Sequence, residues 1–336
     1  MKILIFSDNH WSQYSSIVRS RGTKYSTRLE KSIETMNWLE SLAIEKDCDL
    51  EVCCGDFFDK AELGAEELTA LQDIKWNTKS HIFIVGNHEL GINSLQYSSA
   101  HLFSLIPNAE VIDKPTYLTE DIFLLPYILE SKRESLVKYL DNRTPRIILS
   151  HNDIAGIQMG KFISQDGFSI KEIENNCQLY INGHLHNGEK ISDKIINIGN
   201  IIGQNFNEDA TKYDHCAFIL DTETLKIEVY RNPYSFNFYK LDLTQNINFD
   251  SIQLENNAVC TIKCLSEDTS KVKEWITNNN KIIESRIIVD LSRSDSSNEF
   301  DAESLSVDHL EKFRQYILDN LGSSDLVISE INEVVK

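Results

Sequence analysis

The chain has 336 residues and a formal net charge of −19. This length allows one large domain with one or two small ones, and the acidic balance argues against nucleic-acid binding through a generally basic surface. No stretch approaches the roughly 20 apolar residues that span a bilayer. Asp8 interrupts the N-terminal apolar run where a signal peptide would continue it. We therefore expect a cytoplasmic protein with no membrane segment.

In chain order, residues 1 to about 240 alternate between predicted strands and helices. Apolar runs typical of buried strands occur at 3–6, 50–54, 81–85, 147–149 and 179–181. Helical spacing predicts helices over 28–45, 62–74, 95–103, 131–140 and 170–175, and shorter strands are expected at 110–112, 117–118 and 122–125. Short strands follow at 195–198, 216–221 and 226–230, with a hairpin turn at 221–224. This order predicts an α/β fold with two stacked sheets and helices outside, a four-layer α/β/β/α sandwich.

The chain becomes Asn-rich and loses its periodicity at 243–254, where we expect a domain boundary. A strand at 259–265, a helix at 271–277 and a strand at 286–291 then predict a small β-α-β capping unit. After a polar run, helical spacing returns at 307–321 and a last apolar segment lies at 326–331. We expect domains at 1–243, 244–298 and 299–336, the last docking its apolar helix faces on a partner.

The cysteine pattern argues against a thiolate metal site. Seven cysteines are present, and Cys53 and Cys54 adjoin within a predicted strand, where neighbouring side chains face opposite ways. Neither a disulfide framework nor a C-x-x-C site fits this spacing. We expect reduced, mostly buried thiols, so any metal ion must be bound by His, Asp and Asn.

Five motifs rich in such donors each follow a predicted strand. They are Asp8-x-His10, Gly55-Asp56-x-x-Asp59, Gly86-Asn87-His88-Glu89, Ser150-His151 and Gly183-His184-x-His186. In open α/β sheets ligands bind just beyond the carboxyl ends of the strands, so we expect these motifs to converge. Imidazole, carboxylate and amide groups suit Mn, Fe, Zn or Co. Seven donors with one shared fit two ions at a separation of roughly 3.5–4 Å, an arrangement that serves in-line phosphoryl displacement.

Any one of these motifs occurs by chance, but the five in this order resemble the calcineurin-like metallophosphoesterase superfamily. The resemblance implies that one ion is bound by Asp8, His10, Asp56 and His186. It implies that the other is bound by Asp56, Asn87, His151 and His184, with Asp56 as the bridge. His88 would protonate the leaving oxygen, Asp59 would orient His88, and a water activated by the ions would attack. Glu89 is expected to stabilise its loop. His81, His101, His215 and His309 match no motif and are expected to be structural.

The superfamily includes phosphatases, nucleotide phosphodiesterases and nucleases. Lys60 after Asp59, and Trp11-Ser12 after His10, depart from the protein phosphatase pattern. The whole-chain layout resembles instead the nuclease subunit of the SbcC–SbcD type, especially the short bacteriophage versions that serve as recombination endonuclease subunits. This resemblance implies a manganese-dependent double-strand exonuclease and single-strand endonuclease that acts as a homodimer with an SMC-like coiled-coil ATPase. A general nucleotide phosphodiesterase without an ATPase, and a non-catalytic scaffold joining an ATPase to DNA ends, are the alternatives.

A basic segment follows the first motif directly. Between residues 11 and 31, five basic residues and one acidic residue give a local net charge of +4, the basic ones being Arg19, Arg21, Lys24, Arg28 and Lys31. One interpretation is a solvated loop and helix face. The other is a clamp on substrate phosphates formed by Arg19, Arg21, Lys24 and Arg28.

Overall fold

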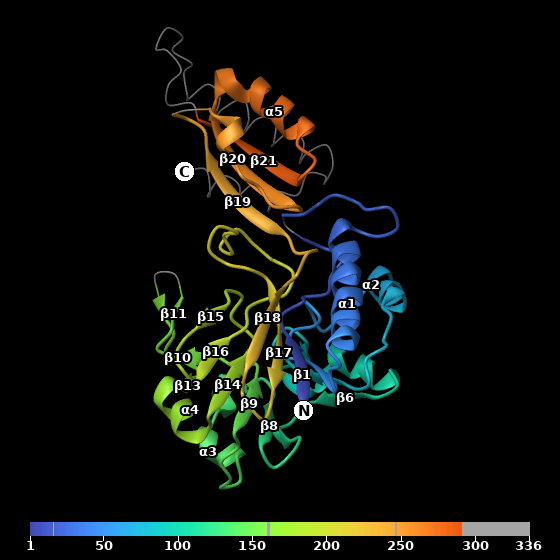
Figure 1. Ribbon diagram of the computed structural model, residues 1–336, viewed down its shortest axis with the longest axis vertical. Helices are drawn as coiled ribbons and strands as arrows, with labels where there is room; N and C mark the ends of the chain where they lie inside the picture. The colour runs from blue at the N-terminus through green and yellow to red at the C-terminus, as the bar shows by residue number, and fades with distance from the viewer. Residues whose placement is uncertain (16, 160–161, 246, 291–336) are drawn as a thin grey trace, which may run out of the picture. The chain divides into compact units, whose positions relative to one another are not determined.

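The computed structural model describes residues 1–15, 17–159, 162–245 and 247–290. The predicted helices at 307–321 and 326–331 lie outside these ranges. The described chain contains two six-stranded sheets (Figure 1). The strand order of the first is β18 (Ile227–Arg231), β17 (Cys216–Asp221), β1 (Lys2–Phe6), β2 (Leu50–Cys53), β3 (His81–Ile84) and β6 (Ala109–Ile112).

The second sheet is built from the middle of the chain. Its order is β15 (Glu189–Lys190), β16 (Ile195–Asn197), β14 (Leu179–Asn182), β9 (Ile147–Ser150), β8 (Ile122–Leu125) and β7 (Thr116–Tyr117). The four strands β1, β2, β3 and β6 are parallel, and so are β8, β9, β14 and β16. Parallel strands end at the same edge of their sheet, so the loops that follow them gather there.

Alternating apolar side chains define the layers of this fold. In β1, Ile3 and Ile5 pack with apolar residues of the second sheet, whereas Leu4 and Phe6 pack with those of α1 (Thr27–Glu45). The opposite face of the second sheet packs on α3 (Leu136–Tyr139) and α4 (Ile170–Asn176). Figure 1 shows α1 on one side of the paired sheets and α3 and α4 on the other. The predicted four-layer sandwich is confirmed.

Two of the predicted helices are shorter than expected. The segment 62–74 forms α2 (Ala65–Ala70) followed by the 3₁₀ helix η1 (Leu71–Asp73). Within 131–140, η3 (Glu130–Lys132) and α3 are separated because Arg133 has an extended backbone. Other predicted elements, including α1, α4 and the hairpin turn after β17, form as expected.

The helix expected at 95–103 is wrong. The residues there form β5 (Ser94–Ser98), which pairs with β4 (Leu90–Gly91), and then the 3₁₀ helix η2 (Ser99–Leu105). Ile92 and Asn93 both have positive φ and turn the chain back into this hairpin. Two further short pairs are β10 (Ile154–Ala155) with β13 (Phe168–Ser169) and β11 (Gln158–Met159) with β12 (Phe162–Ile163).

A small sheet contains the predicted β-α-β unit. Its strands are β19 (Asn237–Asp242), β20 (Ala258–Leu265) and β21 (Ile282–Asp290), and α5 (Thr269–Asn278) connects the last two. The short 3₁₀ helices η4 (Phe249–Ser251) and η5 (Ser266–Asp268) lie in the connections. Since β19 pairs with β20, this sheet begins before the Asn-rich segment, and a division at residue 243 falls directly after one of its strands.

Two composition-based expectations can be compared with the described residues. All seven cysteines are unpaired and buried, as predicted, and burial raises the pKa of Cys48 to about 11. In the part of the chain that the structure describes, no helix combines the length and the apolar character that crossing a membrane requires.

Candidate metal centre

The carboxyl ends of strands from both six-stranded sheets bring together the seven predicted metal ligands. Asp8 lies two residues beyond β1, and Asp56 and Asn87 lie three residues beyond β2 and β3. His151 follows β9 directly, and His184 and His186 lie in the loop after β14. Backbone hydrogen bonds hold these loops together, because the Asp8 N–H donates to the Gly55 carbonyl and the His10 N–H donates to the Asp56 carbonyl, both at 3.0 Å.

The backbone at this edge adopts unusual conformations. Asp8, His10, Asp56 and His184 all have positive φ, at 52°, 46°, 50° and 74°. A residue with a Cβ atom loses roughly 1–2 kcal/mol in this left-handed region, and such strain clusters at functional sites. Gly55 also has φ of 93°, and a Cβ atom there would collide with the His151 ring. The backbone of these loops is therefore strained locally, and this strained conformation places the side chains at the centre.

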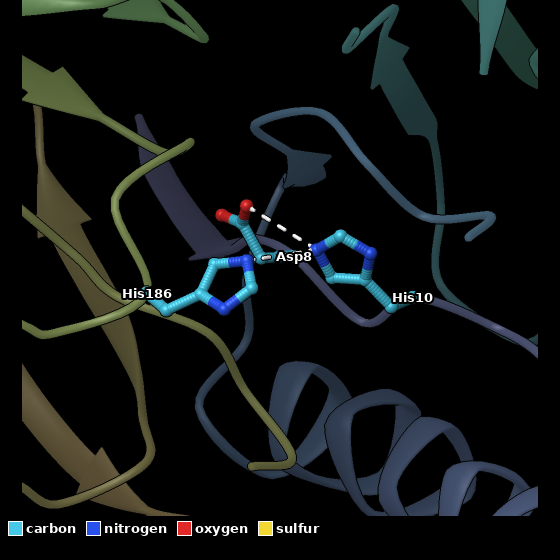
Figure 2. A group of neighbouring side chains, drawn as sticks. All are labelled: Asp8, His10 and His186. Atoms are coloured by element: carbon cyan, nitrogen blue, oxygen red, sulfur yellow. Dashed lines mark hydrogen bonds and ion pairs between the residues drawn. The ribbon is translucent and has the colours of Figure 1, made fainter. Parts of the chain in front are cut away.

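Asp8, His10 and His186 form the first group of donors (Figure 2). One donor atom of each lies within 4.8 Å of the others. His10 Nε2 is 3.1 Å from His186 Nε2 and 3.8 Å from Asp8 Oδ1. Asp8 and His10 are buried, whereas 29% of the His186 side chain is exposed.

Asp56, Asn87, His151 and His184 form the second group. His151 Nε2 is 3.1 Å from Asp56 Oδ2 and 3.2 Å from Asn87 Oδ1, and His184 Nδ1 is 2.9 Å from Asn87 Oδ1. Asp56 Oδ2 is also 4.0 Å from His10 Nε2. Asp56 therefore lies between the two groups, as the bridging position requires.

In each of the four histidine rings, one nitrogen contacts a residue outside the centre. The other nitrogen faces the centre. The outer nitrogens contact acceptors, in the pairs His10 Nδ1 with Asp59 Oδ1 (3.0 Å), His151 Nδ1 with the Cys54 carbonyl (2.7 Å), His184 Nε2 with Asp153 Oδ1 (3.0 Å) and His186 Nδ1 with Glu208 Oε1 (3.2 Å). Metal-binding histidines almost always donate their second ring N–H to such an acceptor. This arrangement leaves one nitrogen lone pair per ring for a cation.

The electrostatics of the centre favour a bound cation. Burial alone would lower the pKa of His10, but its hydrogen bond with Asp59 and the neighbouring Asp8 carboxylate outweigh burial and raise the pKa to about 10. Burial would likewise lower the pKa of His151, but the negative charge of Asp56 outweighs burial and raises it to about 9. Burial would raise the pKa of Asp56, but the charge of His151 holds it well below its ordinary value. The carboxylates are therefore ionised, and a metal ion would replace the ring protons.

One buried atom of the centre lacks a partner. Asp8 Oδ2 accepts a hydrogen bond from the His184 N–H at 3.0 Å, but Asp8 Oδ1 has no hydrogen-bond partner among the described residues. An unsatisfied buried carboxylate oxygen is costly. His10 Nε2 and His186 Nε2 face each other at 3.1 Å, so one cation placed between them could bind both rings. The donor set therefore fits divalent metal ions.

His88 lies at the rim of the centre, with 43% of its side chain exposed. Its ring packs edge-on against His10 with centroids 4.6 Å apart, and its Nδ1 is 3.0 Å from the carbonyl oxygen of Asp59. The Asp59 carboxylate is 3.9 Å from His88 but 3.0 Å from His10. The expected orientation of His88 by Asp59 thus involves the Asp59 backbone, while the carboxylate holds His10.

Glu89 stabilises its loop, as expected. Its carboxylate accepts hydrogen bonds from the Gly86 N–H at 2.8 Å and the Phe58 N–H at 3.1 Å, so it joins two of the loops that carry metal-ligand candidates. Burial and the nearby charge of Asp56 raise its pKa to about 7.

Asp153 and Glu208 contact histidines of the centre, and neither was predicted from the sequence. Asp153 lies two residues after His151, and its only sequence signal was this proximity to a motif. Glu208 lies in a polar loop 22 residues after His186 and gave no signal. Both hold the outer nitrogens of the last motif, so they belong to the centre.

The basic segment does not form a uniform phosphate clamp. Arg28 is wrong as a phosphate contact, because its guanidinium is buried and donates hydrogen bonds to the carbonyls of Asn9, His10 and Gly203. These bonds tie α1 to the first metal-site loop. At the surface, Arg21 pairs with Glu66 and Lys24 with Asp73, both at 2.7 Å. The backbone N–H of Arg19 donates to Glu284 of β21 at 3.1 Å.

A family comparison agrees with this geometry. The family model described as calcineurin-like phosphoesterase matches residues 1–188, which span the motifs from Asp8 to His186. This match covers more than half of the chain. The chain therefore belongs to the calcineurin-like phosphoesterase family, and it is a hydrolase of phosphoester bonds.

Among curated proteins, the chain is 28% identical over 194 residues to the probable exonuclease subunit 1 of Escherichia phage T5, covering 54% of this chain and 55% of the relative. It is 25% identical over 108 residues to exonuclease subunit 1 of Enterobacteria phage T4, covering 31% and 32%. The chain thus spans only a third to about half of these relatives. A solved dimetal phosphatase from Danio rerio matches at 11% identity and a TM-score of 0.40, covering 69% of this chain and 99% of that one.

Proposed function

We propose that this chain is a metal-dependent DNA nuclease that hydrolyses phosphodiester bonds. The observation that carries the proposal is the convergence of seven potential metal ligands from five strand ends, with His88 at the rim of the same centre. The names of the two phage relatives, both exonuclease subunits, support a nucleic acid as the substrate.

In this proposal Asp8, His10, Asp56 and His186 hold one divalent ion, and Asp56, Asn87, His151 and His184 hold the other. The mixed imidazole, carboxylate and amide set suits Mn²⁺, with Mg²⁺ or other divalent ions as substitutes. When bound, the two ions would lower the pKa of an attacking water and neutralise charge that develops on the phosphate. Asp59, Cys54, Asp153 and Glu208 orient the rings, so the inward nitrogens are preorganised before metal arrives.

His88 supplies the proton for the leaving oxygen. Its Nδ1 faces a carbonyl oxygen, which only accepts hydrogen bonds, so Nδ1 carries a proton. Nε2 is then the nitrogen that gains and releases a proton. Because 43% of the side chain is exposed and the ring lies against His10, Nε2 can reach a substrate at the centre. His88 therefore acts as a general acid without being a metal ligand.

The remaining parts of the chain receive roles in DNA and partner binding. Residues 1–243 form the nuclease domain, residues 244–298 a cap that contacts DNA, and residues 299–336 the region that binds an SMC-like coiled-coil ATPase. The net charge of −19 disfavours tight DNA binding by this subunit alone. The ATPase, together with Arg19, Arg21 and Lys24, supplies phosphate contacts within a homodimeric complex. The word subunit in both relatives' names supports a complex.

The test is digestion of end-labelled duplex DNA and of single-stranded circles with Mn²⁺, with and without the proposed SMC-like ATPase partner. The chain should degrade duplex ends with the ATPase and cut single strands. Asp56→Asn, which alters the shared ligand, should abolish both activities, whereas Asp193→Asn at the exposed surface should abolish neither. Hydrolysis of bis(p-nitrophenyl) phosphate without any DNA cleavage would refute the nuclease proposal.

A further inference from the structure

A second group of ionisable side chains lies near the amino-terminal ends of β2 and β3, whereas the metal centre follows their carboxyl ends. It comprises Glu40 of α1, Glu51 of β2 and His81, the first residue of β3. Each is only 1% exposed. One donor atom of each lies within 4.8 Å of the others, although the residues are far apart in sequence. The group therefore arises from the packing of α1 on the sheet.

Hydrogen bonds with the Thr78 hydroxyl connect the two carboxyl groups. Glu40 Oε1 is 2.8 Å from His81 Nε2, and Glu40 Oε2 accepts from the Asn77 N–H, the Thr78 N–H and the Thr78 hydroxyl. The Thr78 hydroxyl is also 3.4 Å from Glu51 Oε2. The Glu51 carboxyl is thus turned into the group rather than toward solvent. The outer oxygen of Glu40 is fixed in the way that protein frameworks fix metal-binding carboxylates.

Two atoms of this group have no partner. Glu51 Oε1 and His81 Nδ1 are buried and make no hydrogen bond among the described residues. Burial, followed by the charge of Glu40, raises the pKa of Glu51 well above its ordinary value. The neutral form of the Glu51 carboxyl is therefore favoured while no cation lies beside it, and a bound cation would stabilise its charged form. The metal centre shows the same signature at Asp8 Oδ1, an orphan carboxylate oxygen among converging donors.

We propose that Glu40, Glu51 and His81 form a second cation site, separate from the metal centre, that binds one Zn²⁺. Three protein ligands of nitrogen and oxygen type with water in the fourth position are the arrangement that catalytic zinc sites use, for example two histidines and one glutamate. Ca²⁺ requires more oxygen ligands, and Mg²⁺ prefers octahedral oxygen coordination. A zinc ion here would neutralise the paired carboxylates and connect α1, β2 and β3. Its role is structural, because the site lies at the end of the strands opposite the metal centre.

The experiment measures zinc in the full chain after the metal centre has been disabled by Asp8→Asn and Asp56→Asn. Zinc content is determined by mass spectrometry after exposure to Zn²⁺ and dialysis. Adding Glu51→Gln, which preserves size but removes the charge, should lower the zinc content by about one equivalent per chain. Glu45→Gln serves as the matched control, because Glu45 lies on the same helix with a 68% exposed side chain. It should leave the zinc content unchanged.

A second measurement protects the test against misfolding of the Glu51 variant. Co²⁺ added to the disabled protein with an intact Glu51 should give the visible absorption bands of a four-coordinate nitrogen and oxygen site, and Zn²⁺ should displace them. Zn²⁺ should also raise the melting temperature of this protein but not of its Glu51→Gln form. Equal zinc content with and without Glu51→Gln, or no zinc-dependent melting shift, would overturn the proposal. Neither result would affect the nuclease proposal, since the tested protein lacks two ligands of the metal centre.

Discussion

Glu208→Gln tests whether the outer contacts of the histidines control metal binding. Glu208 is 1% exposed, and its Oε1 is 3.2 Å from His186 Nδ1 and 3.0 Å from Asn205 Nδ2. Its Oε2 accepts from the Gln204 N–H at 2.6 Å. Glutamine keeps the shape but offers one oxygen and one NH₂ group. Whichever way the amide is oriented, its NH₂ faces a donor, either His186 or Gln204.

The expected change in metal affinity follows from the loss of one of these contacts. Changing an outer partner of a metal-binding histidine typically lowers metal affinity by about 10- to 100-fold, or about 1.4 to 2.7 kcal/mol. If the amide keeps its oxygen on His186, the Gln204 loop is disturbed instead, and the Glu208→Gln effect falls at the lower end. We therefore expect at least about a tenfold rise in the Mn²⁺ concentration that gives half-maximal activity.

The assay is the Mn²⁺ dependence of bis(p-nitrophenyl) phosphate hydrolysis, with calorimetric titration of Mn²⁺ into the metal-free protein. Asp193→Asn is the control, because Asp193 is 98% exposed and pairs with the surface lysine Lys190. It should behave as the unaltered chain. Melting in EDTA verifies that Glu208→Gln is folded. An unchanged Mn²⁺ dependence in a folded Glu208→Gln protein would refute the reasoning.

Three further predictions follow. His88→Asn should lower kcat by about 10²- to 10⁴-fold without changing calorimetric Mn²⁺ affinity; weaker Mn²⁺ binding would make His88 a ligand. Arg28→Ala should lower the free energy of unfolding in urea by about 3 kcal/mol, whereas Arg21→Ala should change it by no more than about 0.5 kcal/mol. An equal loss for both variants would contradict the buried role of Arg28. Burial raises the pKa of Glu30, but hydrogen bonds from Lys24 and Tyr25 outweigh it and lower the pKa. Its stabilisation should be full above pH 4.5 and lost as pH falls through the lowered pKa, so the stability gap to Glu30→Gln should narrow in acid.

The potential metal ligands at the strand ends could be predicted from the sequence because a local pattern indicates each of them. Apolar runs mark buried strands, and a polar residue directly after such a run must lie at the sheet edge. Parallel strands then carry Asp8, Asp56 and Asn87 to the same edge without any knowledge of the loops. The proximity of the seven donors could therefore be expected from the order of motifs alone.

Contacts that depend on loop paths could not be predicted. Glu208 reaches His186 only because the chain after β16 folds back over the centre, and nothing local encodes that path. Arg28 looked like a surface cation because composition does not reveal burial, whereas α1 directs it at three carbonyl groups. The hairpin at residues 90–98 was missed because Leu95 to Phe103 also has helical spacing, and the turn at Ile92 and Asn93 decided the outcome.

The most direct test of the central claim is a crystal structure of the chain soaked with Mn²⁺, with anomalous scattering used to locate the ions. Two peaks should appear at the sheet edge, joined by Asp56, with the inward nitrogens of His10 and His186 on one and those of His151 and His184 on the other. An edge without anomalous signal, or manganese bound only elsewhere on the chain, would contradict the account.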